Sequence, residues 1–142
     1  MNAKNDAVTI ARSSGDAIKA GNGEFIFRLS ELSRNSSSQG YASSVVQGER
    51  IQVSLITKTK GDKAPRPHTH PNEQWNYILQ GTLRVQIGNQ PEQLCGPGTL
   101  LYFPANVEHA TAAMPNEDVV FFAVKDTSHG MFDGKPVDKS QQ

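Results

Sequence analysis

The feature that most constrains the fold is a regular series of turns that begins at Gly61 and ends with the Met-Pro-Asn-Glu-Asp turn at 114–118. Short segments of alternating apolar and polar residues, rich in Val, Ile, Thr and aromatic side chains, lie between these turns. They predict strands over 74–79, 82–87, 93–95, 99–103, 109–113 and 119–124. No segment has the periodicity of an amphipathic helix. The sequence therefore predicts an all-β fold, an antiparallel sandwich or barrel.

Two further strand regions precede these turns. Phe25, Phe27 and Leu29 alternate with other residues over 24–32, and this period of two predicts a strand. Residues 45–59 are rich in Val, Ile and Thr with a break at glycine, so they predict one or two strands.

The rest of the chain predicts polar flanking segments. Residues 33–44 contain six serines and one glycine, so we expect a loop or a mobile segment there, or a lid over a barrel mouth. The predicted barrel extends over 24–124. It lies between a polar N-terminal arm, 1–23, and a polar C-terminal tail, 125–142, that either wraps over the barrel or is disordered.

Charge and cysteine content exclude several classes of protein. Fourteen basic and 14 acidic residues give a formal net charge of zero, so the chain lacks the basic excess of nucleic-acid-binding proteins. Cys95 is the single cysteine, which rules out an intramolecular disulfide. No apolar run approaches the ~18 residues of a membrane span, and the first residues lack the apolar core of a secretion signal. We therefore expect a cytoplasmic protein without a membrane or nucleic-acid partner.

Three of the four histidines have positions that suggest one site. His68 and His70 are two residues apart, so in an extended chain both imidazoles point to the same face. Gln74 has the same parity, whereas Glu73 has the opposite parity and points away from the pair. His109 begins another predicted strand.

These residues resemble the two signatures of the cupin superfamily. Gly61 to Gly81, with the sequence HTHPNEQ at 68–74, looks like the first signature. Residues 98–109, GTLLYFPANVEH, resemble the second. The resemblance implies a double-stranded β-helix, the jelly-roll barrel of two antiparallel sheets. It also implies a metal ion inside the barrel, held by His68, His70, Gln74 and His109.

The sequence departs from the signatures at specific positions. Gln74 stands where the common pattern has glutamate, Asn106 replaces a glycine of the second signature, and Ala113 replaces its final asparagine. One extra residue also separates Gly61 from His68. Asparagine tolerates positive φ better than most residues, so the turn at Asn106 is compatible with the pattern. A site of three histidines and one glutamine resembles a minority of cupins, including some polyketide cyclases.

Three imidazoles and an amide oxygen suit one divalent transition metal ion per chain: Fe, Co, Ni, Cu or Zn, with Mn binding more weakly. All four ligands are neutral, so the ion keeps its full double positive charge. It is therefore a stronger Lewis acid than the same ion bound to a carboxylate. Gln74 could instead hydrogen-bond to a ligand while water completes the shell of the metal.

Three hypotheses for the function follow. In the first, the protein is an enzyme that uses the metal as a Lewis acid on a small oxygen-rich organic substrate, for isomerisation, cyclisation or elimination. In the second, it is a metal-dependent dioxygenase. In the third, it is a non-catalytic module that binds a metal or a small ligand. Fold alone does not choose among them.

The sequence leaves the acid–base chemistry open. Tyr102 and Glu108 flank the second signature, and His129 lies in the polar tail, so these three are candidate catalytic residues, with a surface role as the alternative for each. Cupin barrels commonly pair through N-terminal strands, so the resemblance also implies a homodimer in which Glu24–Leu32 extends the sheet of a second copy.

Overall fold

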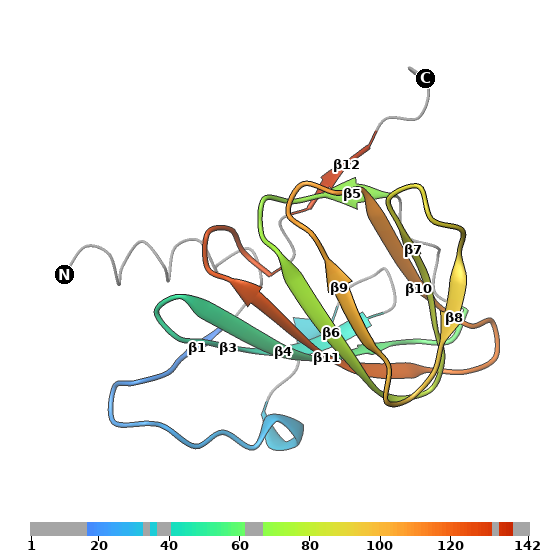
Figure 1. Ribbon diagram of the computed structural model, residues 1–142. Coiled ribbons are helices and arrows are strands. Elements are labelled where there is room, and N and C mark those ends of the chain that lie inside the picture. The colour runs from blue at the N-terminus through green and yellow to red at the C-terminus, as the bar shows by residue number, and fades with distance from the viewer. Residues whose placement is uncertain (1–16, 33–34, 37–40, 62–66, 132–133, 138–142) are drawn as a thin grey trace.

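A computed structural model describes residues 17–32, 35–36, 41–61, 67–131 and 134–137. Two β-sheets face each other and enclose the core (Figure 1). The described residues contain no α-helix and one short 3-10 helix, η2 (Leu29–Glu31). The predicted all-β class is confirmed.

The larger sheet has seven strands in the order β1-β3-β4-β11-β6-β9, with β2 paired to β3. Their bounds are β1 Ile18–Lys19, β2 Asn35–Ser36, β3 Tyr41–Gln47, β4 Ile51–Lys58, β6 Gln74–Gln80, β9 Leu100–Phe103 and β11 Val119–Asp126. All pairs are antiparallel except β1 with β3.

The smaller sheet has five strands in the order β12-β5-β10-β7-β8, all antiparallel. Their bounds are β5 His68–Thr69, β7 Leu83–Ile87, β8 Gln93–Cys95, β10 His109–Ala113 and β12 Lys135–Pro136. From β4 to β7 and from β8 to β12, each strand lies in the opposite sheet from the strand before it. This arrangement is the predicted double-stranded β-helix.

The interior of the larger sheet changes from apolar to polar along its strands. At one end, Ile56, Phe121 and Ile78 are paired neighbours on β4, β11 and β6, and all three are buried. Toward the other end, two rows of inward-facing residues are largely polar. They are Ser54, Ala123 and Asn76 in one row, and Gln47, Gln52, Lys125 and Gln74 in the next. One end of the barrel is thus a packed core, and the other presents hydrogen-bonding groups.

The predicted strand at Glu24–Leu32 is wrong. Residues 24–28 have no strand geometry, and η2 follows them. Phe25 and Ile26 are 78% and 80% exposed. None of the described strands pairs with this segment, and an alternating pattern without a hydrogen-bonding neighbour does not form a stable strand.

The serine-rich segment is also more ordered than expected. Residues 41–44 belong to β3, which lies between β1 and β4 and also pairs with β2. Ser43 and Ser44 are 0% and 1% exposed. Small side chains fit where both faces of the strand are covered, so tertiary packing overrides the polar composition. Residues 33–34 and 37–40 lie outside the described residues.

The C-terminal segment wraps over the end of the barrel that carries the polar rows. The Gln52 side-chain amide donates to the carbonyl oxygens of Asp126 and His129, at 2.8 and 2.6 Å. The Lys125 ammonium donates to the Met131 carbonyl. Met131 is 2% exposed and joins the apolar core, and β12 then pairs with β5. The described part of the predicted tail is therefore part of the barrel.

Asn106 has φ 62°, and it is the one described non-glycine residue in the left-handed region. The prediction that asparagine preserves this turn is confirmed. Its backbone N–H donates to the His70 carbonyl at 2.8 Å, which ties the turn to the histidine segment. No helix in the described part of the chain is long and apolar enough to cross a membrane.

Candidate metal centre

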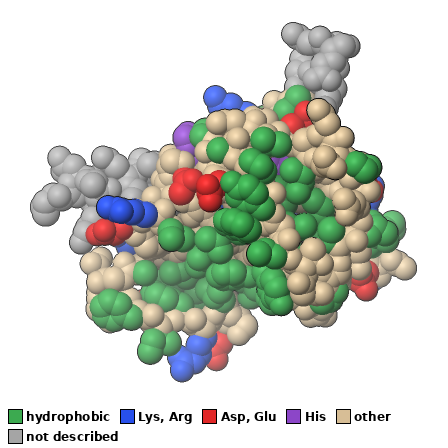
Figure 2. All heavy atoms as spheres, viewed as in Figure 1, with side chains coloured by type: hydrophobic (Ala, Val, Ile, Leu, Met, Phe, Trp, Pro, Cys, Tyr) green, Lys and Arg blue, Asp and Glu red, His purple; other side chains and the backbone are tan. Residues whose placement is uncertain are grey.

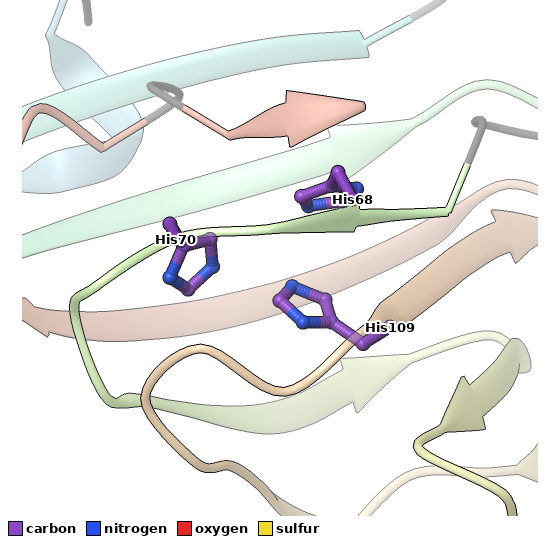
Figure 3. A group of neighbouring side chains, drawn as sticks. All are labelled: His68, His70 and His109. Carbon is purple, nitrogen blue, oxygen red and sulfur yellow. The ribbon is translucent and has the colours of Figure 1, made fainter. Parts of the chain in front are cut away.

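Three histidines from the smaller sheet and its loops meet inside the polar end of the barrel. His68 lies on β5 and His109 on β10, and the two are directly paired neighbours in the ladder. His70 follows β5, and all three imidazoles point toward one another (Figure 3). Their possible ligand nitrogens lie within 4.8 Å of one another.

Backbone carbonyls orient two of the rings. His70 Nδ1 lies 2.9 Å from the Asn72 carbonyl oxygen, and His109 Nδ1 lies 3.0 Å from that of Val107. A carbonyl only accepts hydrogen bonds, so each Nδ1 carries the proton and each Nε2 keeps a free lone pair. His70 Nε2 is buried and has no hydrogen-bond partner among the described residues. This is the tautomer that binds a metal ion.

Neighbouring residues pack closely against the rings of the three histidines. The Phe103 ring lies 4.7 Å from that of His109. A Cβ atom on Gly134 would lie 2.5 Å from His68 Cδ2, so the C-terminal segment packs directly on the His68 ring. His70 and His109 are 2% and 3% exposed, so water has little access to these two rings.

The surroundings keep two histidines neutral. Burial, and then the positive charge of Lys125, lower the pKa of His70 from 6.5 to about 4. Burial lowers the pKa of His109 from 6.5 to about 3, and the charges of His68, His70 and Lys125 act in the same direction. Both rings are therefore unprotonated at neutral pH, which is the state a metal ion requires.

Gln74 lies where its parity predicted. It is half-buried at the start of β6, its side chain contacts the His70 ring, and its amide nitrogen donates to Asn76 Oδ1 at 2.8 Å. Glu73 is exposed. The hydrogen bond to Asn76 leaves the Gln74 amide oxygen for another contact, and its ligation of a metal stays a prediction.

The structure does not bring the three candidate catalytic residues into the cluster. Tyr102 lies on the outer face of β9, where its ring packs at a tilt against that of Trp75, with centroids 4.5 Å apart. Glu108 is half-buried just before β10 and is not among the grouped ligand atoms. His129 is exposed; its carbonyl accepts hydrogen bonds from Gln52 and Asn72, and its ring Nδ1 lies 3.3 Å from Ser128 Oγ rather than near the other histidines.

The sequence interpretation missed two buried residues beside the cluster. Asn72 is fully buried, and its amide donates to the carbonyls of Asp126 and His129, both at 3.0 Å. Lys125 is 3% exposed, and its charge reaches both His70 and His109. The signal for Asn72 was its parity with His68 and His70. Lys125 continues the alternation of β11, but its charge makes it look like the first residue of the polar tail.

The donor set fits a divalent transition metal. His68, His70 and His109 would supply three imidazole nitrogens, and an amide oxygen from Gln74 is the predicted fourth ligand. The buried, unpartnered Nε2 of His70 is the observation that a metal ion would explain best.

Comparison with protein families gives one match. A family described as "Cupin domain" matches residues 54–125, which is half of the chain. These residues run from within β4 to the next-to-last residue of β11 and include all three histidines and Gln74. No curated protein matches the chain.

Solved structures share the fold at low sequence identity. The polyketide cyclase RemF from Streptomyces resistomycificus is 14% identical with a TM-score of 0.69, over 80% of this chain and 85% of that one. KdgF from a Halomonas species is 17% identical with a TM-score of 0.64, over 83% of this chain and 100% of that one. An RmlC-like cupin from Shewanella frigidimarina is 14% identical with a TM-score of 0.65, over 84% and 97%.

Proposed function

This chain belongs to the cupin family, and from that premise we propose that it is a metal-dependent enzyme acting on a small oxygen-rich organic substrate. His68, His70, Gln74 and His109 would hold one divalent ion per chain. The ion would supply Lewis acidity for isomerisation, cyclisation or elimination. The observation that carries the proposal is the convergence of three imidazoles, of which His70 and His109 are kept neutral by burial, in the polar half of the barrel.

The polar rows of the larger sheet support an oxygen-rich substrate. Gln47 Nε2 and Ser54 Oγ are buried and have no hydrogen-bond partner within the described parts of the chain. Buried polar groups rarely stay unsatisfied, and an amide N–H and a hydroxyl both can donate to substrate oxygens. These side chains face the same interior as the histidines, so they would orient a substrate beside the metal.

Charge further narrows the substrate class. All four proposed ligands are neutral, and Lys125 brings a buried ammonium whose field acts on His70 and His109. Developing negative charge on a carboxylate or enolate oxygen is stabilised in such a positive environment. We therefore favour substrates that carry or develop an oxyanion during the reaction.

One observation favours a second candidate. Tyr102 lies on the outer face of the sheet, His129 is exposed, and the Glu108 carboxylate is not grouped with the three imidazoles. In the described part of the chain, none of the three expected acid–base groups therefore belongs to the cluster itself. A module that binds a metal or a small ligand without turnover fits this arrangement. The dioxygenase alternative depends on the identity of the metal, because it requires a redox-active ion such as iron.

Metal analysis together with substrate turnover tests the proposal. Untagged protein purified without chelators should contain about one divalent ion per chain. The His68→Ala/His109→Ala variant should fold, by circular dichroism, and contain none. A panel of diketones, phenols and hydroxy acids should then be turned over without oxygen consumption. Bound iron with substrate-dependent oxygen uptake would show that the protein is a dioxygenase. Bound metal without turnover of any substrate would show that it is a binding module. Metal retained by the double variant would refute the proposed site.

The role of Gln74 has its own test. Gln74→Glu adds a negative ligand, so it should keep or tighten metal binding and make an iron-loaded site easier to oxidise. Glu73→Gln, at the exposed neighbouring position, is the control and should change neither property. An unchanged metal spectrum and potential in Gln74→Glu would show that Gln74 is not a ligand.

A further inference from the structure

The hydrogen-bond donors at the polar end of the barrel are closed off from solvent. Lys125 is 3% exposed, and Gln52 and Asn72 are both 0% exposed. Residues 127–131, which we call the closing loop, follow β11 and turn back over this end of the barrel (Figure 1). A substrate therefore cannot reach the three side chains unless part of the barrel moves.

The three buried side chains hold the closing loop by its backbone carbonyls. Gln52 Nε2 and Asn72 Nδ2 donate to the His129 carbonyl at 2.6 and 3.0 Å, and the Lys125 ammonium donates to the Met131 carbonyl. A carbonyl oxygen carries only a partial negative charge. An ammonium and two amides bind a carboxylate more strongly, because hydrogen bonds between charged groups are the stronger kind.

The opposite ends of the same two amides also indicate a ligand. Gln52 Oε1 and Asn72 Oδ1 are buried and have no hydrogen-bond partner among the described residues. Buried acceptors rarely stay unsatisfied. The loop carbonyls that these amides contact only accept, so they cannot satisfy them. A hydroxyl group next to a carboxylate would supply the donor.

The closing loop is able to move without disrupting either sheet. Residues 127–131 contain no strand, and the ladders of β11 and β12 do not include them. Next to β11, the Thr127 hydroxyl donates to the Glu49 carbonyl at 2.9 Å in an exposed bond, which water replaces at little cost. The Met131 side chain, 2% exposed in the apolar core, is the part of the loop that must leave the core.

We propose that the closing loop is an internal competitor for the ligand of the barrel, and that Lys125, Gln52 and Asn72 exchange its carbonyls for the carboxylate and hydroxyl of a hydroxycarboxylate when it opens. The inference rests on the proposed function for the role of this ligand as a substrate, and it adds the substrate class and the residues that select it. Because the ligand binds only the open state, its presence raises the population of that state.

Thiol labelling of the metal-free protein tests whether the loop opens by itself. Met131→Cys and Ala113→Cys, each in a Cys95→Ser background, place a thiol at a position that is 2% exposed, the first in the loop and the second in β10. After correction for the stability of each variant, Ellman's reagent should label position 131 about 100-fold or more faster, because the sheets stay intact. Equal corrected rates would overturn the proposal.

Oxidation of the wild-type chain gives the same information without a variant. Hydrogen peroxide should convert Met131 to its sulfoxide faster than the rate of global unfolding allows, as measured by peptide mass spectrometry. Oxidation of Met131 only at the rate of global unfolding would show that the loop does not open by itself.

Two matched probes test the ligand class. Glycolate carries a carboxylate and a hydroxyl, and glycolamide is its uncharged counterpart. Glycolate at about ten times its Kd should accelerate labelling at position 131 by about 10-fold, because it holds the loop open. Labelling at position 113 should not accelerate, and glycolamide should have little effect. No response to glycolate, or an equal response to glycolamide, would overturn the assignment of a carboxylate to this site.

Two lysine variants locate the response. Lys125→Leu should abolish the acceleration by glycolate. Lys58→Leu should keep it, because Lys58 is a half-buried lysine of β4 that donates to the Thr111 carbonyl instead. A response that survives Lys125→Leu would place glycolate elsewhere and refute the proposal. All these measurements use metal-free protein, so a failure to bind metal would refute the proposed function and leave the loop result standing.

Discussion

At the scale of single residues, the candidate site depends on the orientation and the protonation state of its imidazole rings. His70 and His109 each hold a backbone carbonyl through Nδ1, which orients the ring and leaves Nε2 for a ligand. Burial lowers the pKa of both rings, so no proton competes with a metal at neutral pH. The same burial makes the two histidines a source of pH-dependent stability.

Acidification should destabilise the metal-free protein. In the unfolded chain both histidines take up a proton near their usual pKa of 6.5, whereas in the folded protein they stay neutral down to about 4 and about 3. The unfolded state therefore binds more protons in this range, and the free energy of unfolding should fall as the pH drops below 6.5. The limit is about 1.4 kcal/mol per pH unit for each histidine. Urea denaturation between about pH 7 and pH 5, with chelator present, measures this slope.

Two histidine variants identify the source of that slope. His109→Gln should reduce it, because the buried neutral ring is gone. His129→Gln should leave it unchanged, because His129 is exposed. Equal slopes in the wild type and His109→Gln would contradict the assignment.

Asn106 should tolerate glycine but not a β-branched residue. Its φ of 62° lies in the left-handed region, which costs most L-residues about 1–2 kcal/mol. Asn106→Gly should leave the free energy of unfolding nearly unchanged, and Asn106→Val should lower it by about that amount. Chemical denaturation of the two variants measures the difference. A Val variant as stable as the Gly variant would show that the turn relaxes.

At the scale of elements, the C-terminal segment closes the polar end of the barrel. Gln52 and Asn72 both donate to the carbonyls of Asp126 and His129, and Lys125 holds that of Met131. β12 then pairs with β5, with Pro136 opposite His68 (Figure 1). A segment expected as a polar tail therefore contributes to the core and to one wall of the metal centre.

Met131 should contribute to stability as a core residue does. It is 2% exposed within the apolar cluster, so Met131→Ala should lower the free energy of unfolding by about 2–5 kcal/mol. Met114→Ala, at a half-buried methionine, should cost clearly less. Thermal and urea denaturation compare the two. Equal losses would mean that the C-terminal segment does not seal the barrel.

At the scale of the whole molecule, the two sheets contribute different groups to the protein. The larger sheet carries the polar rows on its inner face and exposed apolar side chains on its outer face (Figure 2), while the smaller sheet supplies the histidines. A metal ion would join β5 to β10, two strands separated by 40 residues of chain between His68 and His109. Binding at that point opposes unfolding of the whole barrel.

A divalent metal should therefore raise the melting temperature. At a free concentration of about 100 times Kd, binding stabilises the folded state by about 2.7 kcal/mol, or about 5–10 °C for a domain of this size. Differential scanning calorimetry with zinc, nickel or cobalt measures the shift, and a chelator should reverse it. The His68→Ala/His109→Ala variant should show no shift; a shift as large as that of the wild type would place the metal elsewhere.

Local sequence patterns were sufficient to predict most strands of the barrel. The strands from β6 to β11 follow from alternation and turns, because side-chain parity is a property of neighbouring residues. The same parity brought His68 and His70 to one face, and Asn106 preserved a turn whose φ its side chain tolerates. The resemblance to the cupin signatures then connected these residues to His109, which no local pattern could do.

The sequence by itself determined the β class, the positions of most strands and the histidines, because each depends on backbone geometry within a few residues. Only the tertiary structure decided which patterns find a partner. Glu24–Leu32 has an alternating pattern, but none of the described strands lies beside it. Ser43 and Ser44 are polar but are buried in β3. Met131 lies in a polar stretch of the sequence but packs in the core. Hydrogen-bond ladders and burial join residues far apart in the chain, so their outcome depends on the assembled barrel rather than on the composition of any one segment.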